Sequence, residues 1–575
     1  MFKNLQNILE KKDFLKFKFI FFFNSVLSIF EFVSVISIPI FISILIEPDI
    51  FFNKVKNYEI LNFLNELSNF DLLVYFSIFI ILIFFLKNVA LVFFIITEQN
   101  QIKRVKTKIL QKLFNFYVNA PYLIHLKRSP EVFSRIISYE INNLDLHMSH
   151  LCKLFRDVIA LLVIFFILLY ASPLITTITL LFFILIAFSY SYKIKPIVNS
   201  KSKLNLFIQK KLFQVSNETF FGIRDLKTMS KEKDVSKIFE GHQKELANNI
   251  FVFKIVESLP KIIFEIIAVV FVLLVTLILS INQNYIEILP KISLFAVCAF
   301  RFIPAFNSII TSRTYLGIAK PYMLSIEKEI QIEKNFIKDN NNNELNKTII
   351  LSLKKDKIIN LREINFSYPE EKKTSLKDIN IEIDKGSTVG ITGVTGAGKS
   401  TLFYIMLGLI RPDKGAVFNY EKNIFNDLKS WREKIGYISQ NIFLMDDTIK
   451  KNITFNFSGQ DIDDEKFEKA LHYSDIAKKI SELDQGANTL IGTNGIRLSG
   501  GERQRIAIAR AIYRDPEIYF MDEATSALDD MTEKKIIDNF NKNFKSKTKI
   551  IIAHRHTSLE SCDNVKKLQK GTISE

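Results

Sequence analysis

The residues best suited to phosphate chemistry lie in the last third of the chain. They follow the pattern G-x-x-x-x-G-K-[ST], as Gly393, Val394, Thr395, Gly396, Ala397, Gly398, Lys399, Ser400 and Thr401. The glycines of such a loop permit a tight turn that aims backbone N–H groups at phosphate oxygens. Lys399 would reach the β- and γ-phosphates, and Ser400 would ligate Mg²⁺. The sequence therefore predicts a nucleoside triphosphate site.

Two neighbouring carboxylates end an apolar stretch further along the chain. Residues 517–523 read Glu-Ile-Tyr-Phe-Met-Asp-Glu, which is typical of a buried strand. Asp522, at the carboxyl end of that strand, is predicted to hold the Mg²⁺ shell. Glu523 is placed one residue further, where it can polarise the attacking water as a general base. Together with the phosphate-binding loop, these residues predict hydrolysis of the nucleotide.

A third motif, Leu498 to Glu502, reads Leu-Ser-Gly-Gly-Glu and resembles the signature of the ABC transporters. The resemblance covers essentially the whole chain, because the landmarks of that family occur in order. It implies that ATP and Mg²⁺ are the cofactors. Tyr368 matches the aromatic residue that stacks on adenine. Gln440 matches the residue that senses Mg²⁺ and takes part in hydrolysis.

The resemblance places the remaining landmarks at a boundary between two subunits. Ser499 and Gly501 match signature positions that contact the γ-phosphate held by the opposite subunit. Asp529 matches the D-loop, and His554 matches the switch histidine that braces the γ-phosphate and the water. Glu502 stands where Gln is common.

The chain contains one phosphate-binding loop and one signature. In the ABC transporters each ATP lies between the loop of one subunit and the signature of the other. The resemblance therefore implies a half-transporter that pairs with a second copy of itself and has two equivalent sites. A heterodimer with a related chain is the alternative.

Six apolar segments, each long enough for a bilayer-crossing helix, precede the phosphate-binding loop. They lie at approximately 17–46, 71–97, 155–172, 173–192, 256–281 and 288–318. Lys and Arg are concentrated in 98–150 and 193–254, which predicts that these segments and the N-terminus are cytoplasmic. Both basic segments are expected to be helical extensions of the spans. The opposing segment 47–70 is more acidic and predicts a short amphipathic helix.

The predicted fold class is an all-α polytopic membrane domain, with six transmembrane helices and long cytoplasmic extensions, followed by an α/β P-loop ABC ATPase domain. The expected bounds are 1–325 for the membrane domain, 326–355 for a linker and 356–575 for the ATPase domain. The net charge of +16 is assigned to cytoplasmic loops, and no nucleic-acid partner is expected. The expected location is the bacterial inner membrane, with the ATPase domain in the cytoplasm.

Charged residues within apolar segments are costly and predict a substrate site. Lys87, Lys261 and Arg301 are three such residues. In a dimer they would form a cationic belt that suits a pyrophosphate better than a cationic drug. Mutual pairing or snorkelling of these side chains is the alternative.

These basic residues, the segment 299–307 and the amphipathic stretch resemble the bacterial flippases of lipid-linked oligosaccharide used in protein N-glycosylation. That family has arginines in the belt, whereas two of the three residues here are Lys. The implied function is ATP-driven flipping of a polyprenyl-pyrophosphate-linked oligosaccharide to the periplasmic leaflet. The alternatives are a multidrug, lipid or peptide exporter, and an ATP-gated channel or regulator.

Overall fold

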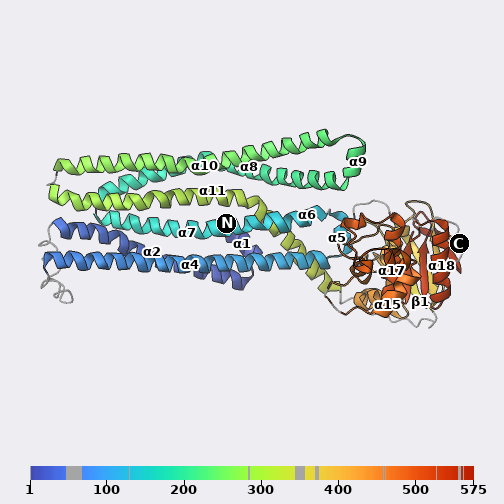
Figure 1. Ribbon diagram of the computed structural model, residues 1–575. Helices are drawn as coiled ribbons and strands as arrows, with labels where there is room; N and C mark the ends of the chain where they lie inside the picture. Colours follow the sequence, from blue (N-terminus) through green and yellow to red (C-terminus); the bar gives the residue numbers. More distant parts are fainter. Residues whose placement is uncertain are drawn as a thin grey trace. The chain divides into compact units, whose positions relative to one another are not determined.

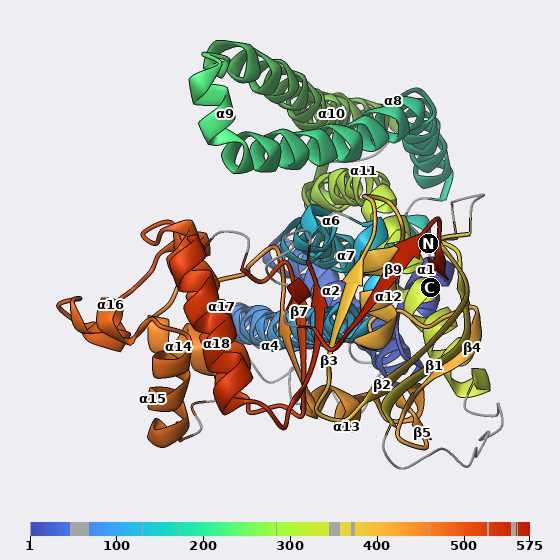
Figure 2. The ribbon, with the colours of Figure 1, turned by 90° about the vertical axis from the view of Figure 1, so that its right-hand side faces the viewer.

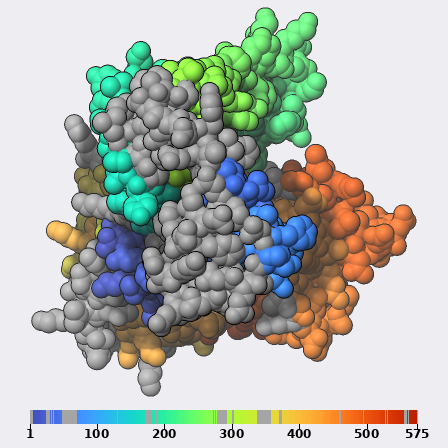
Figure 3. Space-filling view, turned by 90° about the vertical axis from the view of Figure 1, so that its left-hand side faces the viewer, coloured from blue at the N-terminus to red at the C-terminus, as the bar shows by residue number. Residues whose placement is uncertain are grey.

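The computed structural model describes most of the chain. The described residues are 2–46, 68–128, 130–171, 173–282, 285–343, 357–369, 374–457, 459, 461–525, 528–553, 559–560 and 562–574. Residues outside these ranges are among those drawn grey in Figure 3. The chain divides into a helical unit, Met1–Ala120 with Arg128–Leu345, and a C-terminal unit, Pro121–Lys127 with Asn346–Glu575.

The helical unit is built from long helices that run side by side (Figure 1). Each predicted span falls within one of them, apart from residue 172, which lies outside the described residues. Both basic segments are helical over most of their length, as expected. The long helices are α2 (Lys11–Ile46), α4 (Asn69–Asn119), α7 (Ile141–Ala171), α8 (Pro173–Phe221), α10 (Glu232–Asn282) and α11 (Tyr285–Asn343). Shorter elements are α1 (Phe2–Ile8), α6 (Pro130–Arg135), the π-helical turn η2 (Ile136–Glu140) and α9 (Ile223–Thr228).

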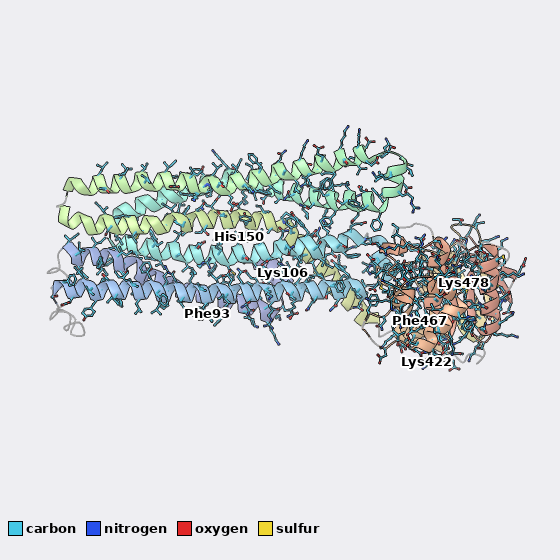
Figure 4. All side chains as sticks on the ribbon, viewed as in Figure 1. Phe93, Lys106, His150, Lys422, Phe467 and Lys478 are labelled. Carbon is cyan, nitrogen blue, oxygen red and sulfur yellow. The ribbon has the colours of Figure 1, made fainter. Side chains whose placement is uncertain are left out.

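The faces of these helices differ in what they contact. Phe264 of α10 and Phe306 of α11 meet edge to face in a buried cluster, with ring centroids 4.9 Å apart. Elsewhere large apolar side chains point outward, and Phe93 of α4, labelled in Figure 4, is 70% exposed. In the described part of the chain, Phe70–Asn119 and Ile292–Phe336 are long and apolar enough to cross a membrane.

Ion pairs join helices that are far apart in the sequence. Lys108 of α4 contacts Glu10 at 2.7 Å and Asp13 at 2.9 Å. Lys112, one turn further along α4, contacts the buried Glu333 of α11 at 3.0 Å. These contacts connect the N-terminal segment, α4 and the far end of α11.

Two predicted boundaries differ from the structure. The linker expected over 326–355 is helical as far as Asn343, because α11 continues to that residue. Residues 344–355 lie outside the described residues. Ile326 and Ile330 are buried in this part of α11, which explains why it stays helical. The short helix α5 (Tyr122–Lys127) groups with the C-terminal unit, although it lies within the range predicted as membrane domain.

The amphipathic helix expected over 47–70 falls almost wholly outside the described residues.

The C-terminal unit contains two sheets. A largely parallel sheet has the order β10-β9-β3-β8-β7-β6, in which only β10 is antiparallel to its neighbour. Its strands are β3 (Thr388–Thr392), β6 (Ile435–Ile438), β7 (Ile518–Asp522), β8 (Thr548–Ile552), β9 (Asn564–Gln569) and β10 (Thr572–Ser574). An antiparallel sheet has the order β2-β1-β4-β5, with β1 (Lys357–Phe366), β2 (Leu376–Asp384), β4 (Lys414–Asn419) and β5 (Lys422–Asn423).

Helices cover both faces of the parallel sheet (Figure 2). Phe520 of β7 packs edge to face on Phe403 of α12 (Lys399–Met406), with centroids 5.5 Å apart. Tyr519, the preceding residue, points to the other face and packs on Phe540 of α18 (Asp530–Asn543). The other helices are α13 (Leu428–Glu433), α14 (Ile449–Thr454), α15 (Asp464–Tyr473), α16 (Ala477–Ser481) and α17 (Gly500–Tyr513), with turns η3 (Ile424–Asn426), η4 (Gly486–Asn488) and η5 (Thr493–Gly495). The sheet is thus buried on both sides, as its apolar strands predict.

Candidate ATP site

The predicted phosphate-binding loop joins the end of β3 to the start of α12. Gly393, Gly396 and Gly398 have φ of 153°, 79° and 103°, a region that residues with a Cβ rarely occupy. A Cβ on Gly393 would lie 2.3 Å from the carbonyl oxygen of Leu568, so this position has no room for a side chain. The loop therefore has the tight backbone that phosphate binding requires.

The lysine of the loop is positioned by the loop itself. Lys399 Nζ donates hydrogen bonds to the carbonyl oxygens of Gly393, at 2.6 Å, and Val394, at 3.2 Å. Its ammonium therefore lies at the mouth of the loop, where phosphate oxygens would replace these carbonyls as partners. Thr401 is buried, and its Oγ1 lies 3.2 Å from the hydroxyl of Tyr368.

The carboxylates lie at the end of β7, as the sequence predicts. Asp522 is the last residue of that strand and is buried. Glu523 has φ of 50°, so the chain turns sharply there. Gln440 Nε2 donates a hydrogen bond to Glu523 Oε2 at 2.7 Å. The predicted general base and the predicted Mg²⁺-sensing amide are therefore in direct contact.

These residues line one cavity of about 670 Å³. Its lining includes residues 394–401 of the loop, together with Tyr368, Gln440, Asp522 and Glu523. Because parallel strands place their carboxyl ends at one edge of a sheet, β3 and β7 bring the loop and the carboxylates together. Ser400, Gln440 and Asp522 offer the oxygen ligands that Mg²⁺ prefers. The residues present fit a nucleotide with Mg²⁺.

The signature residues lie at the start of α17. Ser499 caps α17: its Oγ accepts from the N–H of Glu502 at 3.2 Å, and Glu502 Oε2 accepts from the N–H of Ser499 at 2.9 Å. This reciprocal pair is a capping box, which explains Glu at this position. Gly501 lies in the first turn of the same helix. Within the described residues, neither Ser499 nor Gly501 lines the cavity of the phosphate-binding loop.

Asp529 also caps a helix. It accepts a hydrogen bond from the N–H of Thr532 at 3.0 Å, at the start of α18. The hydrogen bonds from Thr532 lower the pKa of Asp529. His554 lies outside the described residues, so its predicted role stays a prediction.

The predicted belt residues lie on three helices of the other unit. Lys87 of α4 is buried, and its Nζ lies 5.5 Å from the ring centroid of Phe84. Lys261 of α10 is exposed. The backbone of Arg301 belongs to α11, but its side chain lies outside the described ones. The belt therefore stays a prediction.

Sequence reasoning missed residues that support the carboxylates. Gln504, buried in α17, donates a hydrogen bond to the backbone carbonyl of Glu523 at 3.2 Å. The hydroxyl of Tyr437 hydrogen-bonds to Asp522, and burial, followed by the charge of Asp522, raises the pKa of Tyr437. The position of Gln504 two residues after the signature is the one available signal.

The helix α5 packs close to this cluster. Tyr122 and Tyr404 meet edge to face, with ring centroids 5.3 Å apart, and Leu123 packs on the same core. Burial, with a further contribution from Tyr122, raises the pKa of Tyr404 to about 12. The segment 121–127 is thus anchored in the unit that holds the ATP site.

Comparison with known proteins agrees with this arrangement. Residues 376–526 match the family model described as ABC transporter. A protein named ATP-dependent lipid A-core flippase, from Wigglesworthia glossinidia brevipalpis, is 41% identical over 218 residues, which cover 38% of this chain and 37% of that protein. A protein named Multidrug resistance-like ATP-binding protein MdlA, from Buchnera aphidicola subsp. Schizaphis graminum, is 40% identical over 238 residues, 40% of each. The matches thus span well under half of these relatives.

One solved structure matches nearly the whole chain. It is described as a bacterial Atm1-family ABC exporter with ATP bound, and it aligns with a TM-score of 0.69 at 20% identity, over 95% of this chain and 94% of the other. This likeness confirms the predicted fold class. The chain therefore has a helical unit followed by a unit whose residues 376–526 match the ABC transporter family model, in the fold of that Atm1-family exporter.

Proposed function

We propose that the protein is an ATP-driven exporter that works as a dimer of identical chains in the bacterial inner membrane. The observation that carries this proposal is the cavity that holds Lys399, Asp522 and Glu523 together. Such a site binds and hydrolyses ATP, and its fusion to long apolar helices couples hydrolysis to movement across a membrane.

The cavity supports a dimer because it lacks the signature. Ser499 and Gly501 do not line it in the described part of this chain. A second copy would bring its own Ser499 to the γ-phosphate, and symmetry would complete the other site in the same way. Each chain then supplies one half of each of two sites.

The chemistry follows from the side chains present. Lys399 and the loop N–H groups would hold the phosphates, while Ser400, Gln440 and Asp522 would ligate Mg²⁺. Glu523 would accept a proton from the attacking water. Since Gln440 donates to the Glu523 carboxylate, ligation of Mg²⁺ by Gln440 would release Glu523 to act on the water.

A substitution of the general base tests this proposal. Glu523→Gln keeps the size of the side chain and removes its basicity, so we expect unchanged ATP binding and a fall in turnover of at least about 100-fold. The measurement is ATP hydrolysis by purified protein, beside equilibrium binding of a fluorescent ATP analogue.

Glu517→Gln is the matched control. Glu517 stands immediately before β7, and its side chain is exposed. This variant should hydrolyse ATP as the wild type does. Turnover by Glu523→Gln at the level of Glu517→Gln would contradict the role given to Glu523.

The proposed cargo is a lipid-linked oligosaccharide with a pyrophosphate group. Two observations support it: Lys87, Lys261 and Arg301 lie within apolar segments, and several relatives are named flippases of a lipid. ATP would drive the sugar head to the periplasmic side while the polyprenyl tail stays in the bilayer. A multidrug exporter is the second candidate, because another relative carries a multidrug resistance-like name.

A further inference from the structure

A cavity of about 370 Å³ lies within the helical unit, between α7, α8 and α11. Since one water occupies about 30 Å³ of liquid, this space can hold a polar head group. Its lining residues belong to segments at or just beyond the cytoplasmic ends of the predicted spans. They include Tyr190 and Asn199 of α8 and Thr314 of α11.

The charges on the cavity wall have one sign. Lys195 of α8 and Arg313 and Lys320 of α11 line it, and no described Asp or Glu does. Arg313 and Lys320 are two turns apart on α11, so they lie on the same face of that helix. All three side chains are exposed, and none of them forms an ion pair with a described carboxylate. Three cations that form no ion pair with a described carboxylate favour an anionic ligand.

A buried imidazole is the second observation. His147 of α7 lines the same cavity and is 4% exposed, yet neither ring nitrogen has a hydrogen-bond partner among the described residues. A buried polar group without a partner is costly, and one common reason for it is a ligand that supplies the partner. Burial lowers the pKa of His147 to about 4, so the ring is neutral and can donate one N–H hydrogen bond.

The helices around the cavity are packed firmly. His150, one turn along α7 and labelled in Figure 4, stacks on Tyr315 of α11 with ring centroids 4.3 Å apart. Where α11 crosses α8, a Cβ on Gly317 would lie 2.9 Å from Val198. Gly317 stands between Arg313 and Lys320 and brings the two helices close. The backbones of α8 and α11 that carry the cations are therefore closely packed against each other.

We propose that this cavity binds the anionic head group of the transported molecule, a phosphate or diphosphate, between His147, Lys195, Arg313 and Lys320. The inference rests on the proposed function for its ligand. It assigns the first capture of the anion to the cytoplasmic end of the helices. The belt formed by Lys87, Lys261 and Arg301 would act later, within the membrane.

The test is binding of radiolabelled farnesyl diphosphate to the purified full-length protein. A Lys399→Ala background removes the phosphate site of the ATP cavity, so that binding reports on the helical unit. Arg313→Gln and Lys320→Gln should each weaken binding several-fold, and the double variant should weaken it at least tenfold. Both side chains are exposed, so these variants should fold. Arg313→Lys should retain most of the affinity.

Lys203→Gln is the matched control, since Lys203 is exposed on α8 but does not line the cavity. Affinity in the double variant equal to that of Lys203→Gln would overturn the proposal, as would equal binding of uncharged farnesol. Inorganic pyrophosphate, added as competitor, separates the two sources of the anion. Complete displacement of farnesyl diphosphate by pyrophosphate supports a site that recognises the anion alone. Binding of farnesyl diphosphate that pyrophosphate does not displace supports a site for a lipid head group.

The two proposals fail separately. ATP turnover that Glu523→Gln abolishes, combined with unchanged binding in the Arg313/Lys320 double variant, would overturn only the anion cavity. Binding that depends on Arg313 and Lys320, together with a wild-type protein that does not hydrolyse ATP, would overturn the exporter and leave the anion site.

Discussion

The residues of the ATP site differ in how far they could be predicted from the sequence. The loop Gly393–Thr401, Asp522 and Glu523 could be predicted because each carries its chemistry in a short local pattern, and the structure places residues 394–401 and both carboxylates around one cavity. Tyr437 could not be predicted, because it reaches Asp522 through folding of distant segments, and the signal for Gln504 is only its place two residues after the signature. The cavity around His147 escaped prediction for the same reason: its residues come from three helices.

The buried imidazoles predict how stability depends on pH. An unfolded histidine has a pKa near 6.5, whereas burial lowers the pKa of His147, and that of His150, to about 4. Between these two pKa values the unfolded chain binds more protons than the folded chain. The contribution of the two neutral histidines to the free energy of unfolding is therefore fully present above pH 6.5 and is lost as the pH falls toward 4. Burial is the main cause in both residues, and the charge of Lys153 lowers the pKa of His150 further.

We therefore expect the melting temperature of the purified protein to fall from pH 7 to pH 5. Between pH 7 and pH 5, the free energy of unfolding should fall by about 2 kcal/mol less in His147→Gln than in the wild type. His472→Gln, in the C-terminal unit, is the control and should keep the wild-type dependence. An unchanged dependence in His147→Gln would show that this imidazole is not the group that resists protonation.

At the scale of elements, the position of the helices follows from the apolar segments. Apart from residue 172, each predicted span lies within one of the six long helices α2, α4, α7, α8, α10 and α11. The linker predicted over 326–355 is helical as far as Asn343, and its polar sequence gave no sign of the tertiary contacts that this part of α11 makes. Glu329 pairs with Arg128 at 2.7 Å and Glu333 with Lys112 at 3.0 Å, and both partners lie some two hundred residues earlier in the chain.

The start of α17 gives a prediction for an element. Ser499→Ala removes the cap of this helix and should lower the free energy of unfolding of the C-terminal unit by about 1 kcal/mol. Glu502→Gln keeps a side-chain oxygen for the N–H of Ser499, so it should change stability by less than about 0.5 kcal/mol. Chemical denaturation of both variants checks this. Equal effects of the two substitutions would contradict the capping box seen here.

At the scale of the whole molecule, the account requires two copies. A chain with Lys399→Ala lacks a working loop, and a chain with Gly501→Asp lacks a working signature, so either alone should be inactive. In a mixture, about half of the dimers would combine both chains and hold one complete site, which gives about a quarter of wild-type turnover at most. ATP hydrolysis after co-expression measures this. Activity no greater than that of the separate variants would contradict shared sites.

The most direct test of the account is transport itself. Purified protein in liposomes should move a lipid-linked oligosaccharide across the bilayer with ATP, measured by access of an added glycosidase to the sugar. Glu523→Gln should abolish this movement, and Glu517→Gln should leave it intact. Lys261→Gln should slow it, whereas Lys254→Gln, at an exposed position before the predicted span, should not. Movement of the oligosaccharide at equal rates without ATP, or in Glu523→Gln, would contradict an ATP-driven exporter.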